Sequence, residues 1–161
     1  MIVYHGSYLP VEKPQIIVSN RTLDFWKGFY TTTNYEQAEK WARKVIKRRK
    51  KANAYVSFYE FDIEEARKIL RVHFFEEADE SWLNYVCDCR AGKDLQDDYD
   101  IVSGPVADDD VYVTLILYER GLLDEEATLK HLKIKKLFNQ ILFHTEKALK
   151  YCKFVRSEKL V

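Results

Sequence analysis

Residues 54–61, with the sequence AYVSFYEF, are dense in β-branched and aromatic side chains and form the clearest strand signal in the chain. Shorter runs of the same kind recur at residues 2–7, 28–31, 70–74, 99–105, 137–143 and 154–155. Helical patterns lie between them at residues 34–51, 63–68, 81–91, 111–117, 124–132 and 145–149. Strands that cluster with interspersed helices, without an internal repeat, predict an α+β fold.

The length of the chain bounds the number of domains. A chain of 161 residues is long enough for one domain with a proper core and short for two, so we predict a single domain over residues 1–161. Hydrophobic residues make up 47% of the sequence, a proportion that argues against a disordered chain.

The charges balance, because Lys+Arg and Asp+Glu both number 26. Such a chain has no net field that attracts nucleic acid or an anionic membrane, so any basic site has to be a local patch. One run of five basic residues occupies positions 47–51, at the end of the helical pattern over 34–51. We interpret this run as a solvated helix end, with docking of RNA or a phosphate as the alternative.

The sequence signals point to the cytosol. The amino terminus has no basic segment leading into an apolar run, and no stretch approaches the ~20 apolar residues of a membrane helix. The three cysteines are an odd number for a disulfide framework, and the C-x-C spacing of Cys87 and Cys89 is poor for a zinc site. We expect reduced, structural cysteines and no metal.

A short motif ends the first predicted strand. His5, Gly6 and Ser7 offer an imidazole, a main chain without a side chain in the way, and a hydroxyl group. A glycine lets a flat ligand come within hydrogen-bond distance of the backbone N–H and C=O, so the motif suits an aromatic ring with a carboxamide. The alternative is an ordinary strand-to-turn junction.

A second motif, GFYTT, occupies residues 28–32. Tyr30 lies within it, and Trp41 follows about three turns into the next predicted helix. The two aromatic rings could face each other across a slot that takes a flat ring by stacking. The alternatives are that Phe29 and Tyr30 fill the strand core and that Trp41 packs the apolar face of its helix.

With these motifs, the sequence resembles the diphtheria-toxin-like and poly(ADP-ribose) polymerase branch of the ADP-ribosyltransferases, which has a His-Tyr-Glu triad. His-Gly-Ser at 5–7 matches its first motif, and residues 25–30 match its second except that Trp26 replaces a glycine. Residues 139–143 resemble its third motif, with Gln140 at the position of the glutamate. More narrowly, the chain resembles a bacterial family of small ADP-ribosyltransferase-like proteins.

The resemblance implies a fold of split antiparallel β-sheets with flanking helices that hold NAD in a cleft. His5 would bind ribose hydroxyls, Gly6 and Ser7 would take the carboxamide, and Tyr30 would stack on nicotinamide. The catalytic positions carried over are His5, Tyr30 and Gln140, and the remaining NAD-binding positions are Gly28, Phe29, Thr32 and Trp41.

The resemblance also implies a reaction, in which a nucleophile attacks the nicotinamide-ribose carbon of NAD and nicotinamide leaves. Gln140 brings no negative charge to the cationic transition state, which favours mono-ADP-ribosyl transfer over polymer synthesis. It also leaves open a silent module that binds NAD or ADP-ribose and acts through a protein partner. The acceptor could be a protein, a nucleic acid or a small molecule, and the family suggests a bacterial toxin with a neutralising partner protein.

A competing interpretation concerns the aspartates, which gather at positions 97, 98, 100 and 108–110. They could form a divalent-metal site of a nuclease or phosphatase. Consecutive aspartates on one turn point in different directions, so we favour an acidic helix start and a solvated loop.

Overall fold

A computed structural model describes residues 1–17, 27–93, 99–106, 109–134, 137 and 139–161 of the chain. The strands are β1 (Ile2–Ser7), β2 (Phe29–Thr32), β3 (Tyr55–Phe61), β4 (Val72–Phe74), β5 (Ile101–Pro105), β6 (Asn139–Phe143) and β7 (Cys152–Lys159). The helices are α1 (Tyr35–Arg49), α2 (Ile63–Ile69), α3 (Glu80–Arg90), α4 (Asp109–Glu119), α5 (Glu125–Ile134) and α6 (Glu146–Leu149). No helix among these residues is long and apolar enough to cross a membrane.

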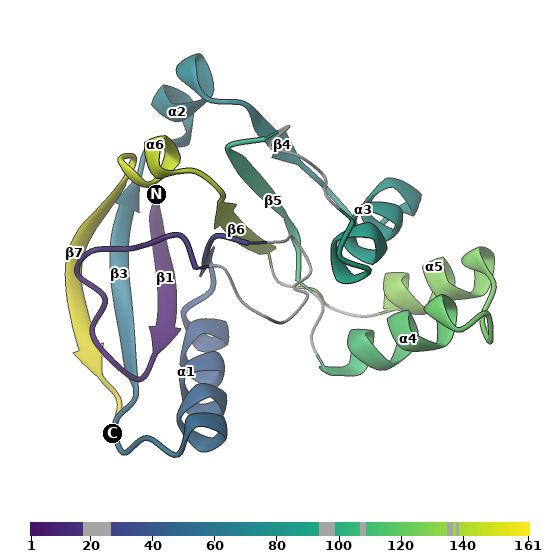
Figure 1. The fold of residues 1–161 in the computed structure, drawn as a ribbon, viewed down its shortest axis with the longest axis horizontal. Coiled ribbons are helices and arrows are strands. Elements are labelled where there is room, and N and C mark those ends of the chain that lie inside the picture. The colour runs from purple at the N-terminus through teal and green to yellow at the C-terminus, as the bar shows by residue number, and fades with distance from the viewer. Residues whose placement is uncertain (18–26, 94–98, 107–108, 135–136, 138) are drawn as a thin grey trace.

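The described strands form one mixed sheet in the order β4-β5-β6-β2-β1-β3-β7 (Figure 1). The prediction of an α+β fold is confirmed. The expectation of split antiparallel sheets is wrong in two respects, because the described strands form one sheet and because β4 runs parallel to β5. The long connection through α3 returns the chain to the same edge in the same direction, as parallel neighbours require.

The sheet narrows at its middle. Residues Tyr4 and Thr32 form the single registered pair that joins β1 to β2. By comparison, β1 pairs with β3 over six residues, and β2 pairs with β6 over four. The sheet is therefore two halves, β4-β5-β6-β2 and β1-β3-β7, connected through one pair of residues.

Local signals explain the ends of α1. The side chain of Asn34 accepts a hydrogen bond from the N–H of Gln37 at 2.8 Å, which satisfies one of the free donors of the first turn. At the other end Lys50 adopts a left-handed conformation with φ of 52°.

The last strand is longer than expected, because β7 extends over Cys152–Lys159 whereas the apolar signal covered residues 154–155 alone.

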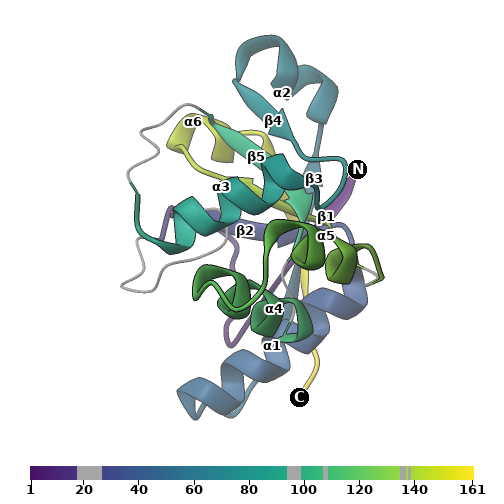
Figure 2. The same cartoon turned by 90° about the vertical axis from the view of Figure 1, so that its right-hand side faces the viewer.

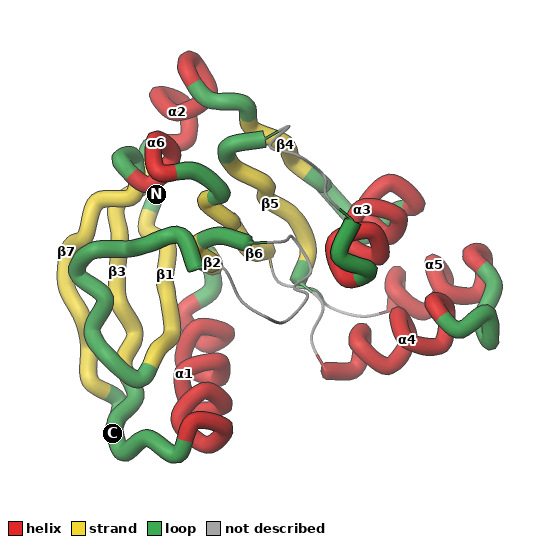
Figure 3. Tube along the Cα trace, viewed as in Figure 1, coloured by secondary structure: helices red, strands yellow, loops and turns green. Residues whose placement is uncertain are grey.

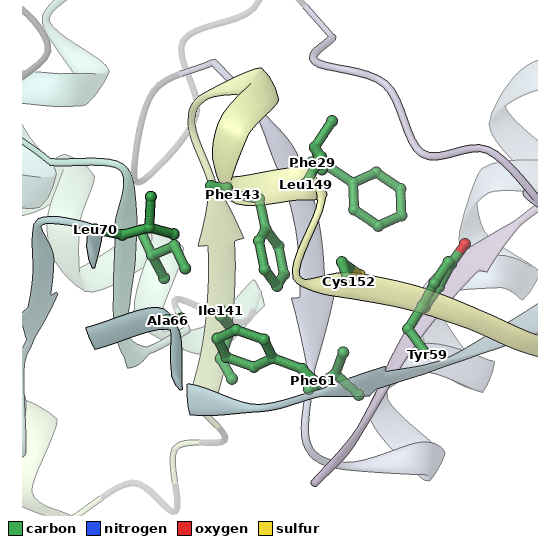
Figure 4. Close-up of a cluster of buried hydrophobic side chains, with 12 residues drawn as sticks. Phe29, Tyr59, Phe61, Ala66, Leu70, Ile141, Phe143, Leu149 and Cys152 are labelled. Carbon is green, nitrogen blue, oxygen red and sulfur yellow. The ribbon is translucent and has the colours of Figure 1, made fainter. Parts of the chain in front are cut away.

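Two apolar clusters form the core. The first cluster gathers around Phe29, Tyr59, Phe61 and Phe143, whose side chains converge in Figure 4. The second cluster joins Val102 and Leu142 of the sheet to Trp82, Leu83 and Val86 of α3 and to Val111, Leu115 and Leu132 of α4 and α5. Helices α3, α4 and α5 accordingly lie together beside the β5 half of the sheet (Figures 2 and 3).

Asp100, just before β5, ties three segments together. Its fully buried carboxylate accepts hydrogen bonds from the N–H of Arg71 at 2.9 Å and from the hydroxyl of Thr145 at 3.0 Å. The ammonium of Lys147 lies 3.5 Å from the same carboxylate. Burial acts to raise the pKa of Asp100, but these hydrogen bonds and the charges of Lys147 and Arg71 outweigh it, so the pKa is lowered.

We expect the variant Asp100→Asn to lower the free energy of unfolding by about 1–3 kcal/mol at neutral pH, because charge-assisted hydrogen bonds are lost. A carboxyl with a lowered folded-state pKa stabilises the fold above the pKa it has when unfolded. That contribution disappears as the pH falls through the folded-state pKa. Urea titrations of both proteins should therefore differ at pH 7 and converge below about pH 4; an equal difference at both pH values would contradict this role.

Candidate functional site

The ladder between β1 and β3 determines where the main chain of the first motif points. Met1 and Phe61 exchange both main-chain hydrogen bonds, each 2.9 Å long. In an antiparallel ladder hydrogen-bonded and non-bonded pairs alternate along the strand. His5, which is paired with Ser57, therefore directs its main-chain groups toward β3, whereas Gly6 directs its N–H and C=O toward β2.

The first motif lies where β1 and β2 separate. Gly6 stands two residues beyond Tyr4, whose pairing with Thr32 is the registered link between these strands. Across the opening, the main-chain oxygen of Tyr30 is 2.7 Å from Nδ1 of His5. The imidazole is thus the hydrogen-bond partner of the Tyr30 carbonyl, which faces β1. The main chain of Gly6 points into the opening between the strands.

The contact with Tyr30 defines the tautomer of His5. A carbonyl oxygen only accepts hydrogen bonds, so Nδ1 carries the proton and, in the neutral ring, Nε2 carries a lone pair. Burial lowers the pKa of His5, although the hydrogen bond to Tyr30 opposes the shift. The ring of Phe29 packs against the imidazole with 4.5 Å between the ring centres. At neutral pH His5 is consequently an acceptor through Nε2.

Gly6 also has a packing role. A Cβ atom at this position would lie 2.1 Å from the carbonyl oxygen of Ala38 and 2.8 Å from the main-chain nitrogen of Ala42. The backbone of α1 therefore rests directly on β1. The absence of a side chain serves the fold here, whether or not a ligand approaches the strand.

The predicted catalytic residues come from adjacent strands but lie on two faces of the sheet. Thr32 pairs with Gln140 and Tyr30 with Leu142, so Tyr30 and Gln140 share one face by the alternation of strand side chains. His5 and Phe29 belong to the opposite face. A ligand that contacts His5, Tyr30 and Gln140 together has to reach through the opening between β1 and β2.

Gln140 is the most unusual side chain of the group. It is 5% exposed, and its Nε2 atom has no hydrogen-bond partner among the described residues. Its neighbour on β5 is Gly104, which has no side chain to contact it. A buried donor without a partner costs about 1–3 kcal/mol, so an acceptor supplied by a ligand would remove this penalty.

The other residues of the second motif hold the strand in place. Gly28 has φ of 151°, and a Cβ atom there would lie 2.4 Å from the main-chain oxygen of Phe143. The hydroxyl oxygen of Thr32 is 2.9 Å from both Gln37 Oε1 and the main-chain oxygen of Asn139. Gly28 and Thr32 thus position β2 for the residues between them. Phe25 and Trp26 of the same motif lie outside the described residues.

Trp41 lies outside the core. Its side chain is 47% exposed, while Ala38 and Ala42 form the buried face of α1. The guanidinium carbon of Arg48 is 5.2 Å from the centre of the indole ring. The interpretation of Trp41 as a residue of the buried helix face is therefore wrong, and its stacking on nicotinamide stays a prediction.

Two residues beside the motif were not among the predicted site residues, because the sequence marks them only as part of a strand. Ser57 pairs with His5, and its hydroxyl accepts a hydrogen bond from the N–H of Val11 at 3.0 Å. The hydroxyl of Tyr59 donates to the main-chain oxygen of Val11. Together these two hydrogen bonds hold Val11, and with it the segment that follows Ser7, over the face of the sheet that contains His5. Ser7 itself is half-buried.

Metal binding finds no support in the described part of the chain, where no three His, Cys, Asp or Glu residues group closely enough to hold an ion. Residues 97, 98 and 108 lie outside that part. Cys87, Cys89 and Cys152 form no disulfide bond. Burial raises the pKa of Cys152 to about 12, so this thiol stays protonated.

We expect Gly6→Ala to lower the free energy of unfolding by about 3 kcal/mol, because the added methyl group collides with the backbone of α1. Gly121→Ala is the matched control. Gly121 has positive φ, 74°, and open space around it, so the substitution there adds only conformational strain of about 1 kcal/mol. Denaturant titrations compare the two variants, and equal losses would contradict the close packing of β1 on α1.

NMR titration of the imidazole resonances should give His5 a pKa below the ordinary 6.5. The nitrogen shifts of the neutral ring should report a proton on Nδ1, because that atom donates to Tyr30. A proton on Nε2 in the neutral form, or a pKa at or above the ordinary value, would show that the contact with Tyr30 is not formed in solution.

Comparison with known proteins yields one match. Searches of curated proteins and of solved structures find no similar protein. A family model described as a protein of unknown function (DUF3990) matches residues 1–154, which include the strands β1, β2 and β6 of the candidate site. Because the match covers nearly the whole chain, this protein belongs to the DUF3990 family.

Proposed function

We propose that the protein binds NAD at the opening between β1 and β2 and transfers its ADP-ribose group to an acceptor as a mono-ADP-ribosyltransferase. The observation that carries the proposal is the arrangement of His5, Gly6 and Tyr30 at this opening. The sequence motifs suggest the same assignment from residue types alone. The direction of the main chain and the contact between His5 and Tyr30 are a separate, geometric argument for it.

The carboxamide of nicotinamide is the group that matches Gly6. The main-chain N–H and C=O of Gly6 point into the opening, and a carboxamide offers one acceptor and one donor to such a pair. The hydroxyl of Ser7 is one residue away on the same strand. The ring of nicotinamide then stacks on Tyr30, whose main-chain oxygen lies at the opening itself.

His5 takes a ribose hydroxyl in this arrangement. Its Nε2 lone pair accepts a hydrogen bond from the hydroxyl, while Nδ1 remains bonded to Tyr30. Because burial lowers its pKa, the imidazole is neutral at pH 7 and keeps that lone pair. His5 orients the sugar rather than transferring a proton.

Gln140 accounts for the expected limit on the reaction. The bond from the ribose carbon to nicotinamide breaks with both electrons going to nicotinamide, and the nucleophile forms the new bond to that carbon. Positive charge builds on the sugar meanwhile. Gln140 offers hydrogen bonds but no negative charge, a loss that commonly costs about 100- to 1000-fold in rate. Slow transfer of single units is the activity that fits.

A second function is favoured by the same residue. A neutral Gln140 with a free Nε2 donor is suited to hold an oxygen of NAD or ADP-ribose without promoting the departure of nicotinamide. In this case the protein is a binding module that acts through a protein partner.

The decisive experiment measures NAD binding by calorimetry and nicotinamide release by chromatography, with label transfer from NAD to lysate components as a third readout. We expect binding in the wild type, and loss of binding in His5→Ala and Tyr30→Ala. Gln140→Glu should increase nicotinamide release by about 100-fold, because it restores the missing charge.

Asn139→Asp is the control, since it places the same charge one residue away on an exposed side chain of β6. It should leave nicotinamide release at the wild-type rate. Binding without release in both the wild type and Gln140→Glu would select the binding module. Absence of NAD binding and of label transfer in the folded wild-type protein would eliminate both functions.

A further inference from the structure

We propose that the C-terminal half of α1, together with Lys50 and Lys51 directly after it, is a binding surface for single-stranded nucleic acid, distinct from the proposed NAD site at the opening between β1 and β2. Residues 40–51 contain eight basic side chains and no acidic one. These are Lys40, Arg43, Lys44, Lys47, Arg48, Arg49, Lys50 and Lys51, and we call them the basic surface. Since the formal charge of the whole chain is zero, the remaining residues carry a net excess of acidic groups.

All eight side chains of the basic surface are exposed. Figure 1 shows α1 along the sheet with its C-terminal end directed away from α3, α4 and α5. Within the basic surface, Arg43 has a salt bridge of 2.8 Å to Glu39, in the turn before it. Five members of the basic surface have no salt bridge to a described acidic residue, namely Lys40, Lys47, Arg49, Lys50 and Lys51.

The helix terminus alone does not explain this charge. Basic side chains in a last turn interact favourably with the partial negative charge of the terminal carbonyl groups, which accounts for Lys47, Arg48 and Arg49. That effect fades within one turn of the end. Lys40, Arg43 and Lys44 lie more than one turn before the end of the helix. A solvated helix end therefore explains the cations of the last turn but not these three.

Aromatic rings are interleaved with the cations. Trp41 is 47% exposed and lies beneath Arg48. Tyr8, just after β1, has Arg49 at 5.5 Å and Lys51 at 5.2 Å from its ring centre. Positive grooves with accessible rings are typical of single-strand binding, because phosphates pair with cations and bases stack on aromatic faces. We therefore assign the surface to a single strand, and an acidic polymer without bases is the alternative that the test has to separate.

The test measures fluorescence anisotropy of labelled 20-nucleotide single strands, one RNA and one DNA, with the full chain and no NAD present. Binding should weaken with salt, by a log–log slope of about 0.7 for each phosphate contact. Tight binding of either strand supports the proposal, and the comparison of the two shows whether the 2′-hydroxyl contributes. Because NAD is absent, the result does not depend on the proposed transferase.

The variant Lys47→Glu/Lys51→Glu should weaken binding by at least about tenfold at moderate salt. Lys133→Glu/Lys153→Glu is the matched control, since it makes the same change in net charge at exposed positions of α5 and β7. The control should change binding by less than about twofold, as only screened, distant charges are altered. Equal weakening by the two variants would overturn the proposal.

The variant Trp41→Ala tests the role of the rings, with heparin as a polyanion that lacks bases. It should weaken binding of the oligonucleotides by about tenfold, the loss of one stacked base, and leave heparin binding unchanged. Its thermal unfolding curve checks the fold. Equal affinity of the wild type for poly-glutamate and for the oligonucleotides, or no binding of either strand, would also overturn the proposal.

Discussion

The hydrogen bond from Nδ1 of His5 to the main-chain oxygen of Tyr30 links the two halves of the sheet at the point where their ladder ends. The strands stay close enough for one side chain to span them, yet the main chain of Gly6 is left facing an opening. If the imidazole were lost, the carbonyl of Tyr30 would be free to pair with β1 and to close that opening. The geometry of the candidate site thus depends on a side chain that is also one of the proposed ligand contacts.

Several parts of this arrangement could be predicted from local sequence. The dense aromatic run at 54–61 predicts β3, and the His-Gly-Ser motif indicates a special main-chain position at the end of β1. The order of the strands could not be predicted in the same way. Pairing of β6 with β2 joins residues more than one hundred positions apart, and no short-range pattern encodes such pairing.

The role of Asp100 was equally hidden. In the sequence it is one of several aspartates that suggest metal chemistry, whereas its position in the structure makes it a buried anchor for Arg71 and Thr145. The exposure of Trp41 could not be read from periodicity either, because that position borders the apolar stripe of α1. In both cases the tertiary surroundings decide what the side chain does, and those surroundings come from distant segments.

The contact of Gly6 with the backbone of Ala38 and Ala42 has a mechanical consequence. A helix that rests on a strand through backbone atoms has no flexible side chains between the two to absorb a displacement. Sideways movement of α1 is therefore transmitted to the edge of β1 that faces the opening. A ligand that binds the exposed side of α1 and displaces this helix therefore also displaces β1 at the opening.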